Sequence, residues 1–169
     1  LKTYFVEFLH NLPFYGLAVL CIDDPGVKSI ISKLSRPILT YGFSKEADYR
    51  ITEFQQKAGQ IEFRVTRPER KRPLKIKLAM PGRHNALNAT AAVAIAADEG
   101  VSDKSIIKGI RGFAGVRRRF DVQGNFPISS GEVTLIDDYG HHPSEVAATV
   151  EALRSGWPDR RLVMVFQPH

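Results

Sequence analysis

A run of polar and titratable residues directly follows a short apolar strand in this sequence. The strand is predicted at Val133 to Ile136, the polar run covers Asp137 to His142, and a helix is expected to start at Pro143. The first N–H groups of a helix have no partner within it, so proline, which has no N–H group, is favoured at this position. The helix dipole also favours the acidic Glu145 near the helix start. Open α/β sheets bind anionic ligands at such strand ends and helix starts. The loop therefore predicts a ligand-binding site.

The side chains of this loop offer different kinds of chemistry. Asp138 could accept hydrogen bonds from ribose hydroxyls, whereas Tyr139, His141 and His142 could bind or orient an anionic substrate. Adjacent histidines also suggest a metal, but neighbours in an extended loop point in different directions and no third ligand lies at metal-site spacing. No metal is therefore predicted for this loop.

A second polar group opens a helix of unusually small residues that follows Gly82. His84 and Asn88 lie one helical turn apart and share a face of that helix. An asparagine amide presents a donor beside an acceptor, which is the pattern needed to recognise the N6 and N7 edge of adenine. His84 and Asn85 could equally cap the helix start, and the residues alone leave both interpretations open.

The third group is the basic run Arg117-Arg118-Arg119 at a predicted hinge between two units. Guanidinium groups present forks of donors that match phosphate, and an arginine in a hinge can reach into a cleft. A charge run is also typical of a solvated face. Arg119 is the best candidate of the three because it precedes Phe120, which should anchor the next strand.

Composition limits the class of protein. The chain has 169 residues, 43% hydrophobic and 25% charged, which is typical of one globular domain or two small ones. The longest apolar stretch, Phe14 to Ile22, is far shorter than the roughly 20 residues of a membrane-spanning helix, so no membrane association is expected. The single Cys21 excludes an intrachain disulfide and favours a reducing, cytoplasmic location.

The net charge of +6 raises the question of a nucleic-acid partner. Much of this charge lies between Arg64 and Lys77, where apolar and polar residues alternate as in two half-buried strands joined by a charged tip, Arg67 to Pro73. No aromatic residues interleave with the basic ones, as stacking on bases would require. We therefore expect solvated charges on a hairpin and no nucleic acid.

The periodicity of the remaining sequence predicts an α/β fold. In order, it indicates a helix at Tyr4–Leu12, a strand at Leu17–Ile22, a short helix at Val27–Leu34, a strand at Ile38–Tyr41, an antiparallel meander from Tyr49 to Leu78, a helix ending at Gly100, a helix with Asp103 as N-cap, strands at Phe120–Phe126 and Val133–Ile136, a helix at Pro143–Arg154 and a strand at Leu162–Phe166. The first crossover favours parallel strands. We place a domain boundary near Val116, giving units 1–116 and 117–169.

Taken together, these segments resemble the Mur ligase family. The resemblance rests on Pro81-Gly82-Arg83-His84-Asn85-Ala86-Leu87-Asn88-Ala89, Gly115-Val116-Arg117-Arg118-Arg119-Phe120-Asp121, Asp137-Asp138-Tyr139-Gly140-His141-His142-Pro143 and Phe166-Gln167-Pro168-His169. It implies that residues 1–116 form the second half of a central ATPase domain, with a parallel sheet and a small antiparallel meander. Residues 117–169 would then begin a Rossmann-like C-terminal domain.

The motifs are most similar to those of family members that join L-alanine to UDP-N-acetylmuramate in peptidoglycan precursor synthesis. The resemblance implies ATP-dependent amide-bond formation, in which the muramyl carboxylate becomes an acyl phosphate that the amine of L-alanine attacks. Matched by position, the resemblance implies that His84, Asn85 and Asn88 contact adenine and that Asp138 contacts the ribose. It implies phosphate contacts and a catalytic role for Arg119. It also implies substrate contacts for Tyr139, His141, His142 and His169, with a catalytic role for His142.

The chain also departs from the family pattern. No Gly-x-x-x-x-Gly-Lys-[Ser/Thr] phosphate loop occurs in the 169 residues, and the magnesium-binding residues are expected upstream of them. The chain is therefore expected to be a piece of an enzyme and inactive alone. Two alternatives remain: a recycling ligase that adds a whole tripeptide to the same nucleotide, and a non-enzymatic module that binds nucleic acid through Arg70, Lys71 and Arg72.

Overall fold

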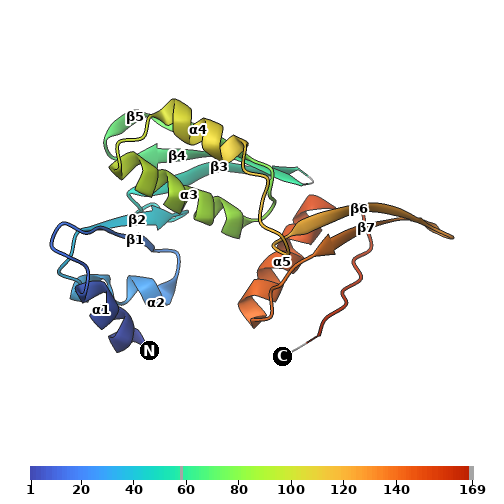
Figure 1. The fold of residues 1–169 in the computed structure, drawn as a ribbon, viewed down its shortest axis with the longest axis horizontal. Coiled ribbons are helices and arrows are strands. Elements are labelled where there is room, and N and C mark those ends of the chain that lie inside the picture. The colour runs from blue at the N-terminus through green and yellow to red at the C-terminus, as the bar shows by residue number, and fades with distance from the viewer. Residues whose placement is uncertain (58, 168–169) are drawn as a thin grey trace.

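The computed structural model describes residues 1–57 and 59–167. Its elements are α1 (Lys2–His10), β1 (Ala18–Cys21), α2 (Pro25–Lys28), the 3-10 helix η1 (Ile31–Lys33), β2 (Ile38–Gly42), β3 (Tyr49–Lys57), β4 (Gln60–Arg67), β5 (Arg70–Leu78), α3 (Arg83–Asp98), α4 (Asp103–Arg111), β6 (Asp121–Ile128), β7 (Gly131–Asp137) and α5 (Pro143–Gly156). The predicted α/β fold class is confirmed (Figure 1). No helix in this described part is long and apolar enough to cross a membrane.

One mixed sheet organises the larger part of the chain. Its strands lie in the order β1-β2-β3-β4-β5, with β1, β2 and β3 parallel and β3, β4 and β5 antiparallel. The predicted parallel crossover and antiparallel meander are therefore both present, and β3 joins them into a single sheet. The long strand β3 brings its C-terminal end toward α5 (Figure 1).

The core lies between this sheet and the helices α3 and α4. Ile61, Phe63 and Val65 alternate along β4 and are at most 1% exposed, because successive side chains of a strand point to opposite faces. Small residues of α3, including Ala86 and Val93, pack on this face and let the helix approach closely. The core thereby holds the start of α3 at the end of the sheet near α5.

The predicted solvated tip of the basic hairpin is wrong at Arg67. Its side chain is buried, and the two terminal guanidinium nitrogens donate to the two carboxylate oxygens of Asp103 at 2.7 and 2.9 Å. Asp103 is also not the N-cap of α4, because Ser102 occupies that position and its Oγ accepts the Ser105 N–H. A charge run alone did not indicate that one of its members has an acidic partner on another element.

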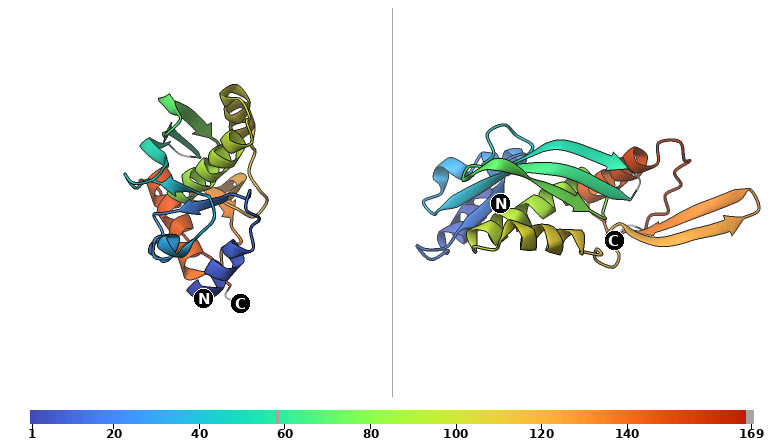
Figure 2. Two further views of the ribbon diagram at one scale, coloured as in Figure 1. Left: turned by 90° about the vertical axis from the view of Figure 1, so that its left-hand side faces the viewer. Right: turned by 90° about the horizontal axis from the view of Figure 1, so that it is seen from above.

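The C-terminal part consists of a two-stranded antiparallel hairpin and α5. Strands β6 and β7 project away from the larger sheet, while α5 lies beside the end of β3 (Figure 2). The predicted strand at Leu162–Phe166 is wrong, since the described residues there form no strand and Val165 is 97% exposed. An extended apolar segment needs a neighbouring strand for its backbone hydrogen bonds, and the described structure places none beside it.

Candidate functional site

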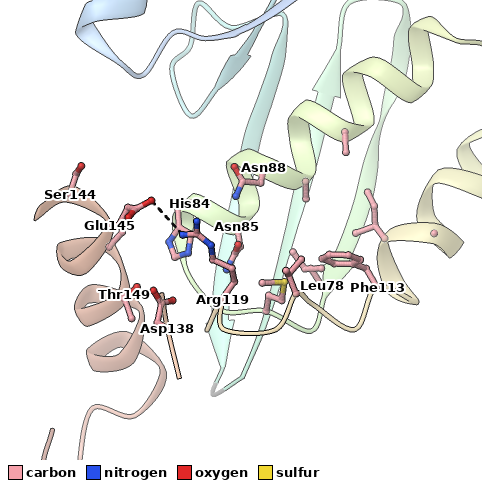
Figure 3. A pocket seen from close by; sticks show the side chains of 17 residues that line it. Leu78, His84, Asn85, Asn88, Phe113, Arg119, Asp138, Ser144, Glu145 and Thr149 are labelled. Carbon is pink, nitrogen blue, oxygen red and sulfur yellow. Dashed lines mark hydrogen bonds and ion pairs between the residues drawn. The ribbon is translucent and has the colours of Figure 1, made fainter. Parts of the chain in front are cut away.

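A cavity of about 710 Å³ opens between α3, α4 and α5. Figure 3 shows its polar side chains converging from both parts of the chain. They include all five residues predicted to contact ATP: His84, Asn85, Asn88, Arg119 and Asp138. The opposite wall is apolar and contains Met80, Ile110 and Phe113. An apolar wall that faces a few convergent polar groups is typical of a small-molecule site.

The start of α3 depends on Gly82. Its φ of +101° lies in the region that favours glycine, and a Cβ there would lie 2.6 Å from Cε1 of His84. The Asn85 amide donates to the Pro81 carbonyl at 2.7 Å and therefore secures this turn. Asn85 thus secures the turn before α3, but the predicted alternative that His84 and Asn85 cap this helix is wrong, because Gly82 is the N-cap and no described side chain caps it.

Asn88 is placed differently from Asn85. Its side chain lies on the cavity side of α3, and its amide makes no hydrogen bond within the described part of the chain (Figure 3). An amide with its donor and acceptor both available at a cavity wall can bind a planar base edge. Asn88 is therefore the polar group of α3 best placed to recognise a ligand.

His84 lies beside Asn88 and is largely removed from solvent. Burial lowers the pKa of the imidazole, and the carboxylates of Asp138 and Glu151 offset part of this effect. The ring is therefore neutral at physiological pH, with one nitrogen as a donor and the other as an acceptor. In this state it can contact a base or sugar without adding positive charge.

Asp138 connects the end of β7 to the segment that precedes β6. Its Oδ2 accepts the Phe120 N–H at 2.9 Å, and its Oδ1 accepts the Gly140 N–H at 2.7 Å. Each carboxylate oxygen retains a second lone pair. Asp138 can therefore hold the backbone in place and still accept a hydroxyl from a ligand in the cavity.

Replacing Asp138 with asparagine is expected to lower the free energy of unfolding by about 1–2 kcal/mol, because the amide supplies only one acceptor oxygen for two backbone donors. Urea unfolding would measure the change, with the exposed Asp159→Asn as the matched control. Equal unfolding midpoints for the two variants would contradict the structural role of Asp138.

Arg119 and Glu145 meet at the mouth of the cavity. The Arg119 Nη1 lies 3.4 Å from Glu145 Oε1, while Glu145 Oε2 accepts the N–H groups of His141 and His142 at 3.2 and 3.3 Å. These backbone hydrogen bonds, followed by Arg119, hold the pKa of the Glu145 carboxyl below its usual range. Glu145 is therefore an anion that orders the loop and orients Arg119.

Sequence reasoning missed Glu145, Ser144 and Thr149 as cavity residues. Glu145 was assigned only to the helix start. A usable signal was present, because Glu145 and Thr149 are separated by one helical turn and share a face of α5. That face points toward α3 (Figure 3).

Of the residues predicted to contact the substrate, the three that the structure describes, Tyr139, His141 and His142, do not line this cavity. The His142 Nδ1 accepts the Ser144 N–H at 3.3 Å, so the ring caps α5 and its neutral form carries the proton on Nε2. The Tyr139 and His141 rings contact each other edge to face, and the Arg118 guanidinium lies 4.5 Å from the Tyr139 ring centroid. His169 lies outside the described residues.

The described residues also contain no group of three or more His, Cys, Asp or Glu side chains that could hold a metal ion. The structure thus separates the predicted site into two sets. The nucleotide set shares one cavity, and Tyr139, His141 and His142 lie in the loop beside it.

Two family models match this chain in succession. The Mur ligase middle domain matches residues 2–96, which is more than half of the chain, and the Mur ligase glutamate ligase domain matches residues 118–169. The chain belongs to the Mur ligase family. The cavity therefore lies between segments that match two different Mur ligase domains. Members of this family are ATP-dependent ligases.

Solved structures of Mur ligases share this fold. UDP-N-acetylmuramate-alanine ligase MurC from Thermotoga maritima is 25% identical with a TM-score of 0.78, and the match covers 99% of this chain and 36% of that one. MurF from Acinetobacter baumannii is 26% identical with a TM-score of 0.75, covering 89% and 32%. MurF from Thermotoga maritima in complex with ADP is 20% identical with a TM-score of 0.72, covering 89% and 33%. The chain thus spans about a third of the length of these Mur ligases.

Proposed function

We propose that this chain forms the adenine-nucleotide side of a ligase that joins L-alanine to UDP-N-acetylmuramate in the cytoplasm. The observation that carries the proposal is the single cavity in which His84, Asn88, Arg119 and Asp138 meet from three separate segments. Membership of the Mur ligase family supports peptidoglycan precursor synthesis as the wider process. The domain boundary that suits this arrangement lies near Val116.

In this proposal the cavity binds the nucleoside part of ATP. The Asn88 amide pairs with the adenine edge, and apolar side chains such as Met80 and Phe113 cover the faces of the base. Asp138 accepts a ribose hydroxyl. The apolar wall excludes water, which strengthens these polar contacts and favours adenine by shape.

Arg119 acts on the phosphates. Its contact with Glu145 is long, at 3.4 Å, and the guanidinium is half exposed. It can therefore exchange this carboxylate for the terminal phosphate of ATP and stabilise the charge that develops during phosphoryl transfer. Magnesium supplies further neutralisation of that charge when bound, and we place its ligands in the part of the relatives' length that this chain does not span.

The reaction then proceeds in two steps. The muramyl carboxylate attacks the terminal phosphorus and releases ADP, giving an acyl phosphate. The amine of L-alanine attacks the acyl carbon and releases phosphate, which forms the amide. We assign Tyr139, His141 and His142 to the substrate side of the cleft, with the His142 Nε2–H directed at an anionic group and His169 following in the same region. The assignment of L-alanine rests on the Tyr-Gly-His-His-Pro motif and the match to MurC.

The proposal predicts that the chain by itself binds adenine nucleotides weakly and selectively. We expect ADP and ATP to shift the NMR signals of His84, Asn88 and Thr149, whereas GTP and a random oligonucleotide at the same concentration do not. The affinity should be low because the sequence contains no phosphate-loop motif, so only part of the nucleotide is bound. Absence of any adenine-dependent shift in the folded chain would refute the proposed function.

A further inference from the structure

One side chain of the sheet connects the two parts of the molecule. The Gln56 Oε1 accepts the Gly82 N–H at 2.8 Å, and its Nε2 donates to the Ala152 carbonyl at 2.8 Å. Gln56 comes from β3, Gly82 immediately precedes α3, and Ala152 lies in α5. A single amide thus accepts a hydrogen bond from the turn before α3 and donates one to α5.

The surroundings of Gln56 show that this contact is tight. Ala152 is 2% exposed, and its Cβ lies 3.2 Å from the position that a Cβ on Gly82 would occupy. The helix α5 therefore rests directly on the turn that starts α3. The two hydrogen bonds of Gln56 oppose separation of the two helices, beside a small cavity of about 80 Å³ that Gln56, His84 and Ala148 line.

This contact lies within about one helical turn of the cavity on both helices. On α3, Gly82 is followed by the cavity residue His84, and on α5, Ala152 follows the cavity residues Ala148 and Thr149. The cavity width between α3 and α5 therefore depends on the distance that the Gln56 amide holds. Within the part of the chain that the structure describes, no other side-chain hydrogen bond joins the five-stranded sheet to α5.

We propose that Gln56 is a positioning residue for the nucleotide: its amide holds α5 against the start of α3 and thereby sets the width of the cavity. This inference rests on the proposed function for the identity of the ligand, but not for the contact itself. Gln56 is not among the residues that line the large cavity, and its amide acts through its hydrogen bonds to Gly82 and Ala152. This positioning role requires both a donor and an acceptor in one side chain, and the glutamine amide supplies both.

The test compares Gln56→Glu and Gln56→Ala with Gln55→Glu and Gln55→Ala. Gln55 is the exposed neighbour of Gln56 in the same strand, so its variants are matched controls for charge and strand propensity. Gln56→Glu keeps an acceptor for Gly82 but turns a carboxylate oxygen toward the Ala152 carbonyl. Lowering the pH protonates the introduced carboxyl, whose pKa this contact raises, and restores a donor.

Two measurements are made on the 169-residue chain. Residual dipolar couplings without nucleotide report whether residues 1–112 and 121–156 tumble as one body, and titration with ADP reports affinity. At pH 7.5 we expect one common alignment for the wild type and the Gln55 variants, and two differing alignments for both Gln56 variants. The ADP dissociation constant should rise about fivefold to tenfold in Gln56→Glu, which loses one of the two hydrogen bonds, and at least as much in Gln56→Ala, which loses both. At pH 4.5 the common alignment should return for Gln56→Glu alone.

Each other outcome is decisive. Common alignment and unchanged ADP affinity in both Gln56 variants would overturn the proposal. Separate alignments with unchanged ADP affinity would show that the amide joins α5 to the start of α3 without setting the width of the cavity. This result would also overturn the proposal. Failure of Gln56→Glu to recover at low pH while the wild type keeps one alignment would exclude the donor role. If ADP binds to no variant, including the wild type, the proposed function fails, whereas the alignments still decide whether Gln56 fixes the two parts.

Discussion

Replacing Asn88 with alanine is expected to weaken ADP binding about tenfold or more and to abolish the preference for adenine over guanine nucleotides. The Asn88 amide lies at the cavity wall with no hydrogen-bond partner among the described residues, so its donor and acceptor are available to a base. Losing one such paired contact costs about 1–3 kcal/mol of binding free energy. Parallel titrations with ADP and GDP would measure both effects.

The matched control is Glu99→Ala, at the exposed far end of the same helix, which should leave both affinities unchanged. Asn85→Ala provides a second comparison, because Asn85 secures the helix start through the Pro81 carbonyl. We expect that variant to lose thermal stability as well as affinity, whereas Asn88→Ala should lose affinity only. Unchanged affinity and purine selectivity in Asn88→Ala would reduce this residue to a structural role.

Replacing Asp103 with alanine is expected to lower the free energy of unfolding by about 2–3 kcal/mol, because it leaves the guanidinium of a buried arginine without its partner. The Arg67 side chain is only 2% exposed, and its Nε already lacks a partner in the described part of the chain. Urea unfolding would measure the loss. Arg67→Met should cost less than Asp103→Ala, since an apolar side chain of similar length needs no partner at this position.

The same ion pair predicts that the free energy of unfolding decreases at acidic pH. The Arg67 hydrogen bond lowers the pKa of Asp103, so the folded state binds this proton less readily than the unfolded chain, whose aspartate titrates near pH ~3.9. The stabilisation is therefore complete above that value and is lost as the pH falls through the lower, folded pKa. Asp103→Ala should show a shallower loss of stability in acid than the wild type. Equal slopes for the two proteins would contradict this assignment.

Much of the local structure was predictable because it depends on neighbours in the sequence. The alternation of Ile61, Phe63 and Val65 predicts a half-buried strand, since a strand has only two faces. The small residues after Gly82 predict a closely packed helix, and the structure forms α3 there. The residues around His84 and Asn88 predict a nucleotide site, and the structure places both side chains at one cavity.

The tertiary structure decided the contacts between residues far apart in the chain. The basic run containing Arg67 carries no sign of its partner Asp103, which lies in a helix of another segment. The pattern of β3 marks Gln56 as an ordinary polar strand residue, yet its amide joins Gly82 to Ala152.

The segment from Leu162 to Phe166 has the composition of a strand but forms none in the described structure, where no strand lies beside it. Hydrophobic periodicity records which face of an element is buried. It does not record which polar group on a distant element completes a hydrogen bond, because that depends on how the elements pack in space. The sequence by itself therefore determined most of the elements and the candidate residues, and the packing of α5 against α3 decided which of those residues share a cavity.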